Sequence, residues 1–267
     1  MEVSNTKEFV SAEPRRRLLA RLVAERGFVR VADASLELGV SEVTVRGDLT
    51  ALEAAGSVVR VHGGAMPVAT GAEASLESSL DRDAAAKRSI GAAAARLVAS
   101  GDAVYVDAGS TSMALAHALV ERHDLRDVTV VTSGLTIALA LEAAGPRFTI
   151  VVTGGTLRPL QHSLVSPFAV PMLDALRLDT AFIGCNGVHA QHGVTNVNLP
   201  EAEIKTRVLG RAQRGVILAD GSKVGATEVA VIAEVGAFDT LVTAGDAPAD
   251  ALAALRSTGL TVDRVDA

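Results

Sequence analysis

Cysteine is almost absent from this sequence: the only one is Cys185, so the chain cannot form an internal disulfide. A single free thiol is typical of a protein in a reducing compartment. Tryptophan is missing and aromatic residues make up only 3% of the 267 positions, so alanine, valine and leucine have to form the core. With 49% hydrophobic residues, the chain has enough apolar side chains for one large domain or for a small and a medium one.

The sequence also lacks any apolar run of the roughly 18 residues that a membrane-spanning helix needs. Its first eight residues are acidic and polar, without the basic and then apolar stretches of a secretory signal. We therefore expect a cytoplasmic protein with no membrane partner.

The net charge of −6 is unevenly distributed along the chain. Between Pro14 and Gly64, eight arginines accompany six acidic residues, for a net charge of +2, whereas the chain from Ala65 onward carries −6. A basic head on an acidic body is expected of a DNA-binding unit joined to a second domain. An ordinary fluctuation in surface charge would produce the same numbers.

The basic segment has the pattern of three helices followed by a strand. A first helix starts at Pro14 and ends at Gly27, a second covers 32–38, and Gly39 forms a tight turn. The first helix carries one apolar stripe, made of Leu18, Leu19, Leu22 and Val23.

Ser41 is placed to cap a third helix, in which Val45, Leu49 and Leu52 form the buried face. The alternation over 57–62 predicts a strand that serves as a wing. Together these elements predict a winged helix-turn-helix, whose recognition helix reads the major groove. A small three-helix packing unit without a DNA role is the alternative.

These residues resemble the DeoR family of bacterial repressors. Residues 40–49 (VSEVTVRGDL), 52–56 (LEAAG) and 60–65 (RVHGGA) are similar to the family patterns V-S-x-x-T-[IV]-R-R-D-L, L-E-x-x-G and R-x-H-G-G-A. The second arginine of the family pattern is Gly47 here, which removes a cation near DNA and weakens the helix. The resemblance implies that the following residues face DNA: Ser41, Glu42, Thr44, Arg46, Arg60 and His62. For Arg15, Arg16 and Arg17 we expect either contacts with phosphate or a solvated helix end.

The segment after the wing contains Pro67, Gly71 and small residues, which predicts a hinge. We expect a winged helix-turn-helix domain over 12–66, a linker over 67–80 and a second domain over 81–267. An alanine-rich helical pattern runs over 74–100.

From Asp102 onward, short apolar runs alternate with helical patterns. This alternation predicts an α/β domain with an open, mostly parallel sheet that resembles the Rossmann type, with helices on both faces. Ligands of such sheets bind beyond the carboxyl ends of the strands. The predicted strands are 103–106, 129–132, 148–152, 180–183, 215–218 and 240–242.

Small, hydroxyl-rich or glycine-rich loops follow four of these strands, at 107–112, 132–134, 153–156 and 184–187. Their hydroxyls, together with the free amides at the start of a helix, suit a phosphate group. Helix capping uses the same residue types and is the alternative for each loop taken alone.

The second domain continues the resemblance to the DeoR family, whose sensor domain is similar in fold to ribose-5-phosphate isomerase. The shared patterns are D-x-G-S-T at 107–111, the T-S and G-G loops, F-I-G-x-x-G-[IV] at 182–188 and D-x-S-K-x-G at 220–225; Ser166 and Val224 depart from the usual glycine and phenylalanine. The effector site expected from the loops and the resemblance comprises Asp107, Gly109, Ser110, Thr111, Ser112, Thr132, Ser133, Gly154, Gly155, Glu201 and Lys223. Glu201 and Lys223 could equally belong to surface ion pairs.

Other kinds of site find little support. The sequence contains neither G-x-G-x-x-G after a strand nor a P-loop, which disfavours nicotinamide and ATP, and we expect no cofactor. The spacing of Cys185, His189 and His192 is not a standard zinc pattern, so we expect no metal.

Three functions remain open. The favoured one is a sequence-specific repressor of a sugar or polyol catabolic operon that binds double-stranded operator DNA under control of a phosphorylated sugar. A second is an isomerase with Glu201 or Asp107 as its base, although no paired carboxylates have a spacing that requires acid–base work. A third is an oligomeric scaffold. We expect no enzymatic activity. We also expect a homo-oligomer, because helix-turn-helix proteins normally read paired half-sites.

Overall fold

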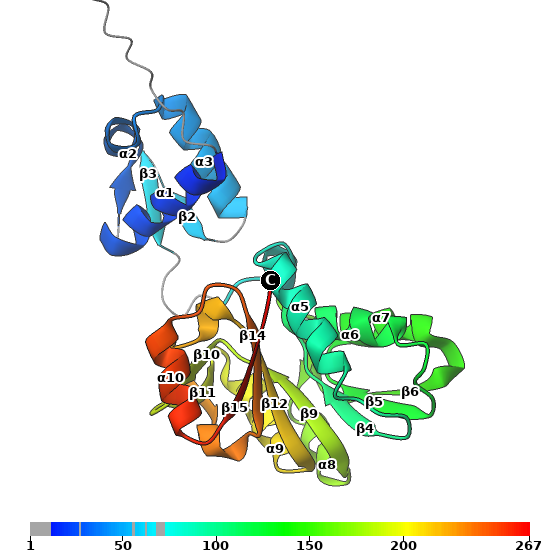
Figure 1. Cartoon of the computed structure of the whole chain (residues 1–267). Helices are drawn as coiled ribbons and strands as arrows, with labels where there is room; N and C mark the ends of the chain where they lie inside the picture. The colour runs from blue at the N-terminus through cyan, green and yellow to red at the C-terminus, as the bar shows by residue number, and fades with distance from the viewer. Residues whose placement is uncertain (1–11, 27, 55–56, 62, 68–72) are drawn as a thin grey trace, which may run out of the picture. The chain divides into compact units, whose positions relative to one another are not determined.

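The computed structural model describes residues 12–26, 28–54, 57–61, 63–67 and 73–267 (Figure 1). The chain divides into two compact units, Met1–Ala74 and Ser75–Ala267, and each is taken by itself. The second unit begins inside the segment 67–80 that the sequence analysis assigns to a linker, because α4 (Leu76–Leu80) packs against a helix of the second unit.

In its described residues, the first unit forms three helices and a small antiparallel sheet. Strand β3 lies between β1 and β2, so the last two strands make a wing beside the helices. The winged helix-turn-helix prediction is therefore confirmed. The elements are α1 (Ala12–Arg26), β1 (Val29–Arg30), α2 (Val31–Leu38), α3 (Glu42–Ala54), β2 (Val58–Val61) and β3 (Gly64–Pro67).

The core of the first unit follows the predicted apolar faces with one exception. Val45, Leu49 and Leu52 of α3 are buried, as expected. From α1, Leu19, Leu22 and Val23 are buried. Leu18 is half exposed, because the buried face of α1 is narrower than the apolar stripe of four residues that the sequence predicts. Gly39 ends α2 in the left-handed conformation, with φ of 65°, which supplies the tight turn into α3.

The second unit is built on a parallel seven-stranded sheet with the strand order β15-β14-β12-β9-β4-β5-β6. The strands of this sheet are β4 (Ala103–Val106), β5 (Val128–Thr132), β6 (Phe148–Val152), β9 (Leu178–Gly184), β12 (Ala212–Asp220), β14 (Thr240–Ala244) and β15 (Thr261–Val265). The chain moves outward from β4 through β5 to β6, then returns to β9 on the other side of β4. The boundary between β4 and β9 is thus the topological switch point, where open α/β sheets bind ligands.

Helices cover both faces of this sheet (Figure 1). Successive side chains of a strand point to opposite faces of the sheet: Val104 and Val106 lie in one core cluster, and Tyr105 lies in the other. The helices are α4, α5 (Ala84–Ala95), α6 (Ser110–Glu121), α7 (Leu135–Leu141), α8 (Ala169–Asp174), α9 (Leu199–Leu209) and α10 (Ala249–Ser257), with short 3-10 turns η1 (Glu142–Arg147), η2 (Gly221–Lys223) and η3 (Val235–Ala237).

Two smaller sheets complete the second unit. Strands β7 (Thr156–Arg158) and β8 (Ser163–Val165) form a hairpin that follows β6. Strands β10 (Gly187–His189), β11 (Gly193–Asn196) and β13 (Ala230–Ala233) form a three-stranded sheet with β13 at its edge. None of these strands was expected from the sequence, and neither was β15.

No helix in the described part of the chain combines the length and the apolar character that crossing a bilayer demands.

Candidate functional site

Helix α3 presents the residues expected to face DNA. Ser41, Glu42 and Arg46 are exposed and Thr44 is half-buried. The Ser41 hydroxyl caps the helix by accepting a hydrogen bond from the Thr44 N–H at 3.1 Å, and Arg46 Nη2 lies 2.6 Å from Glu42 Oε2. Exposed pairs of this kind contribute at most about 1 kcal/mol, so Arg46 can exchange Glu42 for a phosphate or a base at little cost.

The wing places one expected residue beside α3. Arg60 is exposed on β2, and its Nη1 donates to Thr50 Oγ1 at 3.0 Å. His62, the other expected wing residue, lies outside the described residues. Val43, which the sequence analysis did not single out, is 76% exposed in the first turn of α3, where an apolar side chain can meet a thymine methyl group.

Asp48 is a structural residue of α3 that the sequence analysis missed. It is buried, and its carboxylate accepts hydrogen bonds from Arg15 Nε at 2.6 Å and from Arg16 Nε at 3.0 Å. Arg15 and Arg16 therefore bind α1 to the recognition helix, a role that the sequence analysis did not assign to them, while Arg17 is exposed.

In the second unit, the switch point holds a buried ion pair between Asp107 and Lys205. Asp107 follows β4, and its Oδ2 lies 3.1 Å from the Nζ of Lys205 on α9. The same carboxylate accepts the N–H groups of Gly184 at 3.0 Å and Ala108 at 2.8 Å, while Lys205 also donates to Asn196 Oδ1 at 3.0 Å. These donors neutralise the charge of Asp107 at the carboxyl ends of β4 and β9.

Glu201 lies one turn before Lys205 on the same buried face of α9. Arg158 of β7 and the hydroxyl of Ser163 on β8 both donate to its Oε1, and Asn196 Nδ2 donates to Oε2 at 3.4 Å. The site therefore contains two carboxylates and two cations in one buried network. Such a network can exchange internal partners for the hydroxyls of a polar ligand.

The charges of this network shift its pKa values in predictable directions. Burial raises the pKa of Asp107, against the opposing charge of Lys205. Burial disfavours the ammonium of Lys205, but the negative charges of Asp107 and Glu201 outweigh this and raise its pKa above 10.5. For Glu201, the charge of Lys205 and the hydrogen bond from Ser163 overcome burial and lower the pKa below 4.5. Lys205 and Glu201 are thus charged at neutral pH.

The first turn of α6 adjoins this network. Its N-cap, Gly109, has φ of 116°, and no side chain caps the first amides of the helix. Ser110 and Thr111 are half-buried, whereas Ser112 is buried and its Oγ has no hydrogen-bond partner among the described residues. Uncapped amides, a helix dipole and a free hydroxyl are the features that bind a phosphate group.

The remaining expected residues divide into three groups. Ser133 Oγ lies 2.8 Å from the hydroxyl of Tyr105, whose pKa is raised by burial and by the nearby charge of Asp107, so Ser133 borders the network. Thr132 Oγ1 accepts the N–H of Gly134 at 3.0 Å. Gly154 and Gly155 instead shape the hairpin: a Cβ on Gly155 would lie 2.1 Å from Val165 O. Lys223 is half-buried in η2 after β12, and the cation that contacts Asp107 is Lys205.

The β7–β8 hairpin also contacts the start of the second unit. The Leu76 N–H donates to Leu160 O at 2.9 Å, and His162 Nε2 lies 3.2 Å from Glu77 Oε1. The buried Lys87 of α5 donates to Ser79 O at 2.6 Å and to Arg82 O at 2.5 Å, which secures α4 from its other end. The hairpin that binds Glu201 therefore also binds α4, the first element after Ala74.

Two of the three residues weighed as a zinc site, His189 and His192, contact each other. The rings of His189 and His192 stack with centroids 4.6 Å apart, and His189 Nδ1 accepts the N–H of Gln191 at 3.1 Å. Within the described residues, no group of three or more His, Cys, Asp or Glu side chains is arranged to hold a metal ion.

Comparison with known proteins covers both units. The family model of the DeoR-like helix-turn-helix domain matches residues 15–70, and that of the DeoR C terminal sensor domain matches residues 82–245. The HTH-type transcriptional regulator GlpR of Haloferax volcanii is 32% identical over 93% of this chain and 96% of its own. The lactose phosphotransferase system repressor of Streptococcus mutans is 30% identical over 86% of this chain and 91% of its own. These relatives are named as regulators and not as enzymes.

Among solved structures, ribose 5-phosphate isomerase A of Methanocaldococcus jannaschii aligns with 51% of this chain and 52% of its own, at 18% identity and a TM-score of 0.38. A likeness at this level says nothing about activity or ligand.

Proposed function

The chain belongs to the DeoR family of transcription regulators, and from that membership we propose that it represses a sugar or polyol catabolic operon. In this proposal the first unit binds double-stranded operator DNA, and a phosphorylated sugar bound to the second unit controls the affinity. In this proposal the protein acts in the cytoplasm. It acts there as a homo-oligomer, because a helix-turn-helix protein reads paired half-sites.

The DNA-binding half of the proposal assigns base and backbone contacts to the exposed N-terminal half of α3 and to the wing. Arg46 reaches a guanine edge or a phosphate, with Ser41, Glu42 and Thr44 beside it, and Arg60 and His62 hold the backbone. The net charge of +2 between Pro14 and Gly64 favours this partner within an otherwise acidic chain.

One observation carries the sensor half: the buried network of Asp107, Lys205 and Glu201 lies at the switch point, next to the uncapped start of α6. We assign the phosphate to the amides and hydroxyls of Gly109–Ser112, and the sugar hydroxyls to the carboxylates and to Lys205. A relative named for a lactose phosphotransferase system supports a sugar-related ligand.

The β7–β8 hairpin supplies the coupling in this proposal. Arg158 and Ser163 bind Glu201, while Leu160 and His162 bind the start of α4. A ligand that draws Glu201 away from Arg158 and Ser163 frees the hairpin, and the change passes to the chain that leads to the DNA-binding unit. Coupling between two sites is reciprocal, so operator DNA must change the affinity for the effector by the same factor.

The test is fluorescence anisotropy of a labelled fragment from upstream of the gene, titrated with the full chain with and without a panel of sugar phosphates and the matching free sugars. We expect sub-micromolar binding that weakens steeply with salt and shifts with one phosphate ester but not with its free sugar. Arg46→Ala should weaken binding, whereas Arg256→Ala, an exposed arginine of α10, should not.

Each half can fail separately. Salt-sensitive binding that no compound alters would remove the sugar-phosphate assignment and keep the DNA-binding one. Binding that stays at the non-specific level on every fragment would remove the operator assignment.

A further inference from the structure

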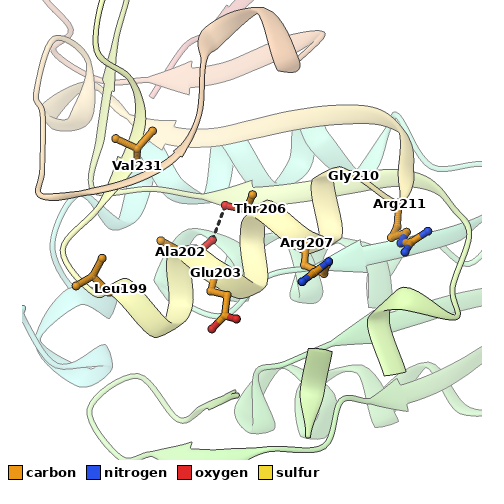
Figure 2. Close-up of a pocket in the computed structure, with 8 residues that line it drawn as sticks. All are labelled: Leu199, Ala202, Glu203, Thr206, Arg207, Gly210, Arg211 and Val231. Carbon is orange, nitrogen blue, oxygen red and sulfur yellow. Dashed lines mark hydrogen bonds between the residues drawn. The ribbon is translucent and has the colours of Figure 1, made fainter. Parts of the chain in front are cut away.

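The outer face of α9 borders an open groove of about 520 Å³ (Figure 2). Leu199 is 66% exposed at one end of the helix, and Val231 is 61% exposed on the neighbouring strand β13. Figure 2 shows these two side chains at one end of the groove, with Glu203 near the middle and Arg207 and Arg211 toward the other end. An apolar surface rimmed by charges is typical of a protein interface.

The strand beside this groove lies at the edge of its sheet. β13 is the last strand in the order β10-β11-β13, and its exposed Val231 lies between the buried Ala230 and Ile232, with the exposed Val229 just before the strand. Apolar side chains on an edge strand favour association with another surface. Helix α9 packs against this strand, and the Thr206 hydroxyl donates to Ile232 O at 2.7 Å, so the exposed Val231 lies next to the outer face of α9.

The charges and sizes along α9 are self-complementary when two such helices run in opposite directions. The N-terminal half of the face offers Leu199 and Glu203, and the C-terminal half offers Arg207 and Gly210. Within one subunit the Ser166 hydroxyl donates to Glu203 at 2.7 Å and Asp174 lies 3.6 Å from Arg207. These partly exposed contacts contribute at most about 1 kcal/mol each, so they can be exchanged for contacts with a second copy. In an antiparallel pair, Leu199 meets the small Gly210 of the second copy, and Glu203 meets Arg207 of the second copy. A two-fold axis repeats each contact, as isologous interfaces require.

We propose that this groove is an interface between two copies of the chain, in which α9 packs antiparallel against α9 of a second copy. The inference rests on the self-association in the proposed function and names its surface. A small-molecule ligand fits the groove less well, because its charged side chains Glu203, Arg207 and Arg211 are exposed along an open face.

Complementary charge reversal tests the contact. The mass of the full chain is measured without DNA by sedimentation equilibrium for the parent, Glu203→Arg, Arg207→Glu and an equimolar mixture of the two variants. In each single variant, like charges meet twice across the axis, and we expect the dissociation constant to rise roughly tenfold. In the mixture both contacts are again between opposite charges, so association should return to the parental level.

The mixture separates this result from a folding defect, since a misfolded variant would not be restored by its partner. Glu121→Arg, the same charge change on the exposed end of α6, is the control and should associate like the parent. A monomeric parent, or a mixture no stronger than its components, would overturn the proposal. The sedimentation measurements omit DNA, so a failure of operator binding would not affect them.

A disulfide tests the direction of packing. Gly210 has a helical φ, and a Cβ there would lie 3.6 Å from Arg207 O and 3.7 Å from Thr206 O, which are ordinary van der Waals contacts, so we expect Gly210→Cys to be tolerated. In the antiparallel arrangement Leu199→Cys/Gly210→Cys should form covalent dimers on oxidation. Either single variant should not, because the two copies of Leu199 lie roughly 16 Å apart along the helix axis at 1.5 Å per residue. Cross-linking of the single variants, or none in the double variant, would contradict the arrangement.

Discussion

Asp48 binds Arg15 across the interior of the first unit, with Arg15 Nε 2.6 Å from Asp48 Oδ2 and Arg16 Nε 3.0 Å from Oδ1. The pair joins the start of α1 to the middle of α3, three residues from the buried Val45. The orientation of the recognition helix therefore depends on a charge contact as well as on apolar packing.

Replacing this carboxylate should loosen α3. Asp48→Asn removes charge-assisted hydrogen bonds, each worth about 2 kcal/mol, and we expect α3 amides in the full chain to lose protection of about that size in hydrogen exchange. Asp33→Asn on the exposed side of α2 is the control and should leave protection unchanged. Equal protection in both variants would show that packing alone positions α3.

The same pair predicts a loss of stability in acid. Burial would raise the pKa of Asp48, but the hydrogen bonds from Arg15 and Arg16 lower it below 3.8. A lowered folded-state pKa gives stability that is complete above the unfolded value and is lost as the pH falls through the folded value. The first unit should therefore weaken below about pH 4, and Asp48→Asn should abolish that part of the pH dependence of amide protection.

Substitution of Gly47 should stabilise α3 and can strengthen DNA binding. It lies on the exposed side of α3, and a Cβ there would contact nothing within 4 Å. Gly47→Ala should stabilise the helix by about 1 kcal/mol with little change in DNA contacts. Gly47→Arg should in addition tighten DNA binding and steepen the slope of log affinity against log salt by about one. An unchanged slope in anisotropy titrations would place position 47 away from the phosphates.

Lys205 and Lys223 can be distinguished by parallel substitution. Lys205→Met leaves Asp107 buried without its cation and should cost about 3 kcal/mol of unfolding free energy, together with the response to sugar phosphates. Lys223→Met removes a half-buried charge and should change stability by less than about 0.5 kcal/mol. Denaturant unfolding and the anisotropy assay supply the two measurements.

A double variant separates stability from sensing. Lys205→Met/Asp107→Leu removes both charges and should regain most of the lost stability, yet remain insensitive to the effector. If only Lys223→Met abolished the response, Lys205 would be a structural residue, and the sequence-based choice of Lys223 would be correct.

Cys185 should resist modification. Although the residue as a whole is half-buried, burial of its thiol raises the pKa to about 12, so little thiolate forms at pH 8. Mass spectrometry after treatment with iodoacetamide should find the native protein unmodified and the urea-unfolded protein fully alkylated. Rapid labelling of the native form would indicate that the loop after β9 opens.

The parallel strands beside the switch point were predictable because they are buried on both faces and form short apolar runs. The strands that were missed have other patterns. β15 lies at a sheet edge with no residue fully buried, and β10 and β11 are joined at Gly193, whose φ of 79° belongs to a tight turn. The helix predicted over 74–100 is broken at Asp83, which has φ of 51° without a glycine or proline to signal it.

The candidate site was predictable where local sequence determines it, as in the loop from Asp107 to Ser112 that opens α6. Its long-range partners were not. The spacing of Glu201 and Lys205 on one helix face was visible in the sequence, but only the fold shows that this face meets Asp107. Arg158 and Ser163 reach Glu201 from a hairpin that no sequence pattern indicated.

Helix α9 carries Glu201 and Lys205 on its buried face and Glu203 and Arg207 on its exposed face. Substitutions at neighbouring positions of this one helix should therefore differ in genetic dominance. In a cell that also carries the parental gene, we expect a subunit altered at Lys205 to enter mixed assemblies without responding to the effector, so its phenotype should be dominant. A subunit altered at Glu203 should enter those assemblies less readily than the parental subunit, so its phenotype should be closer to recessive.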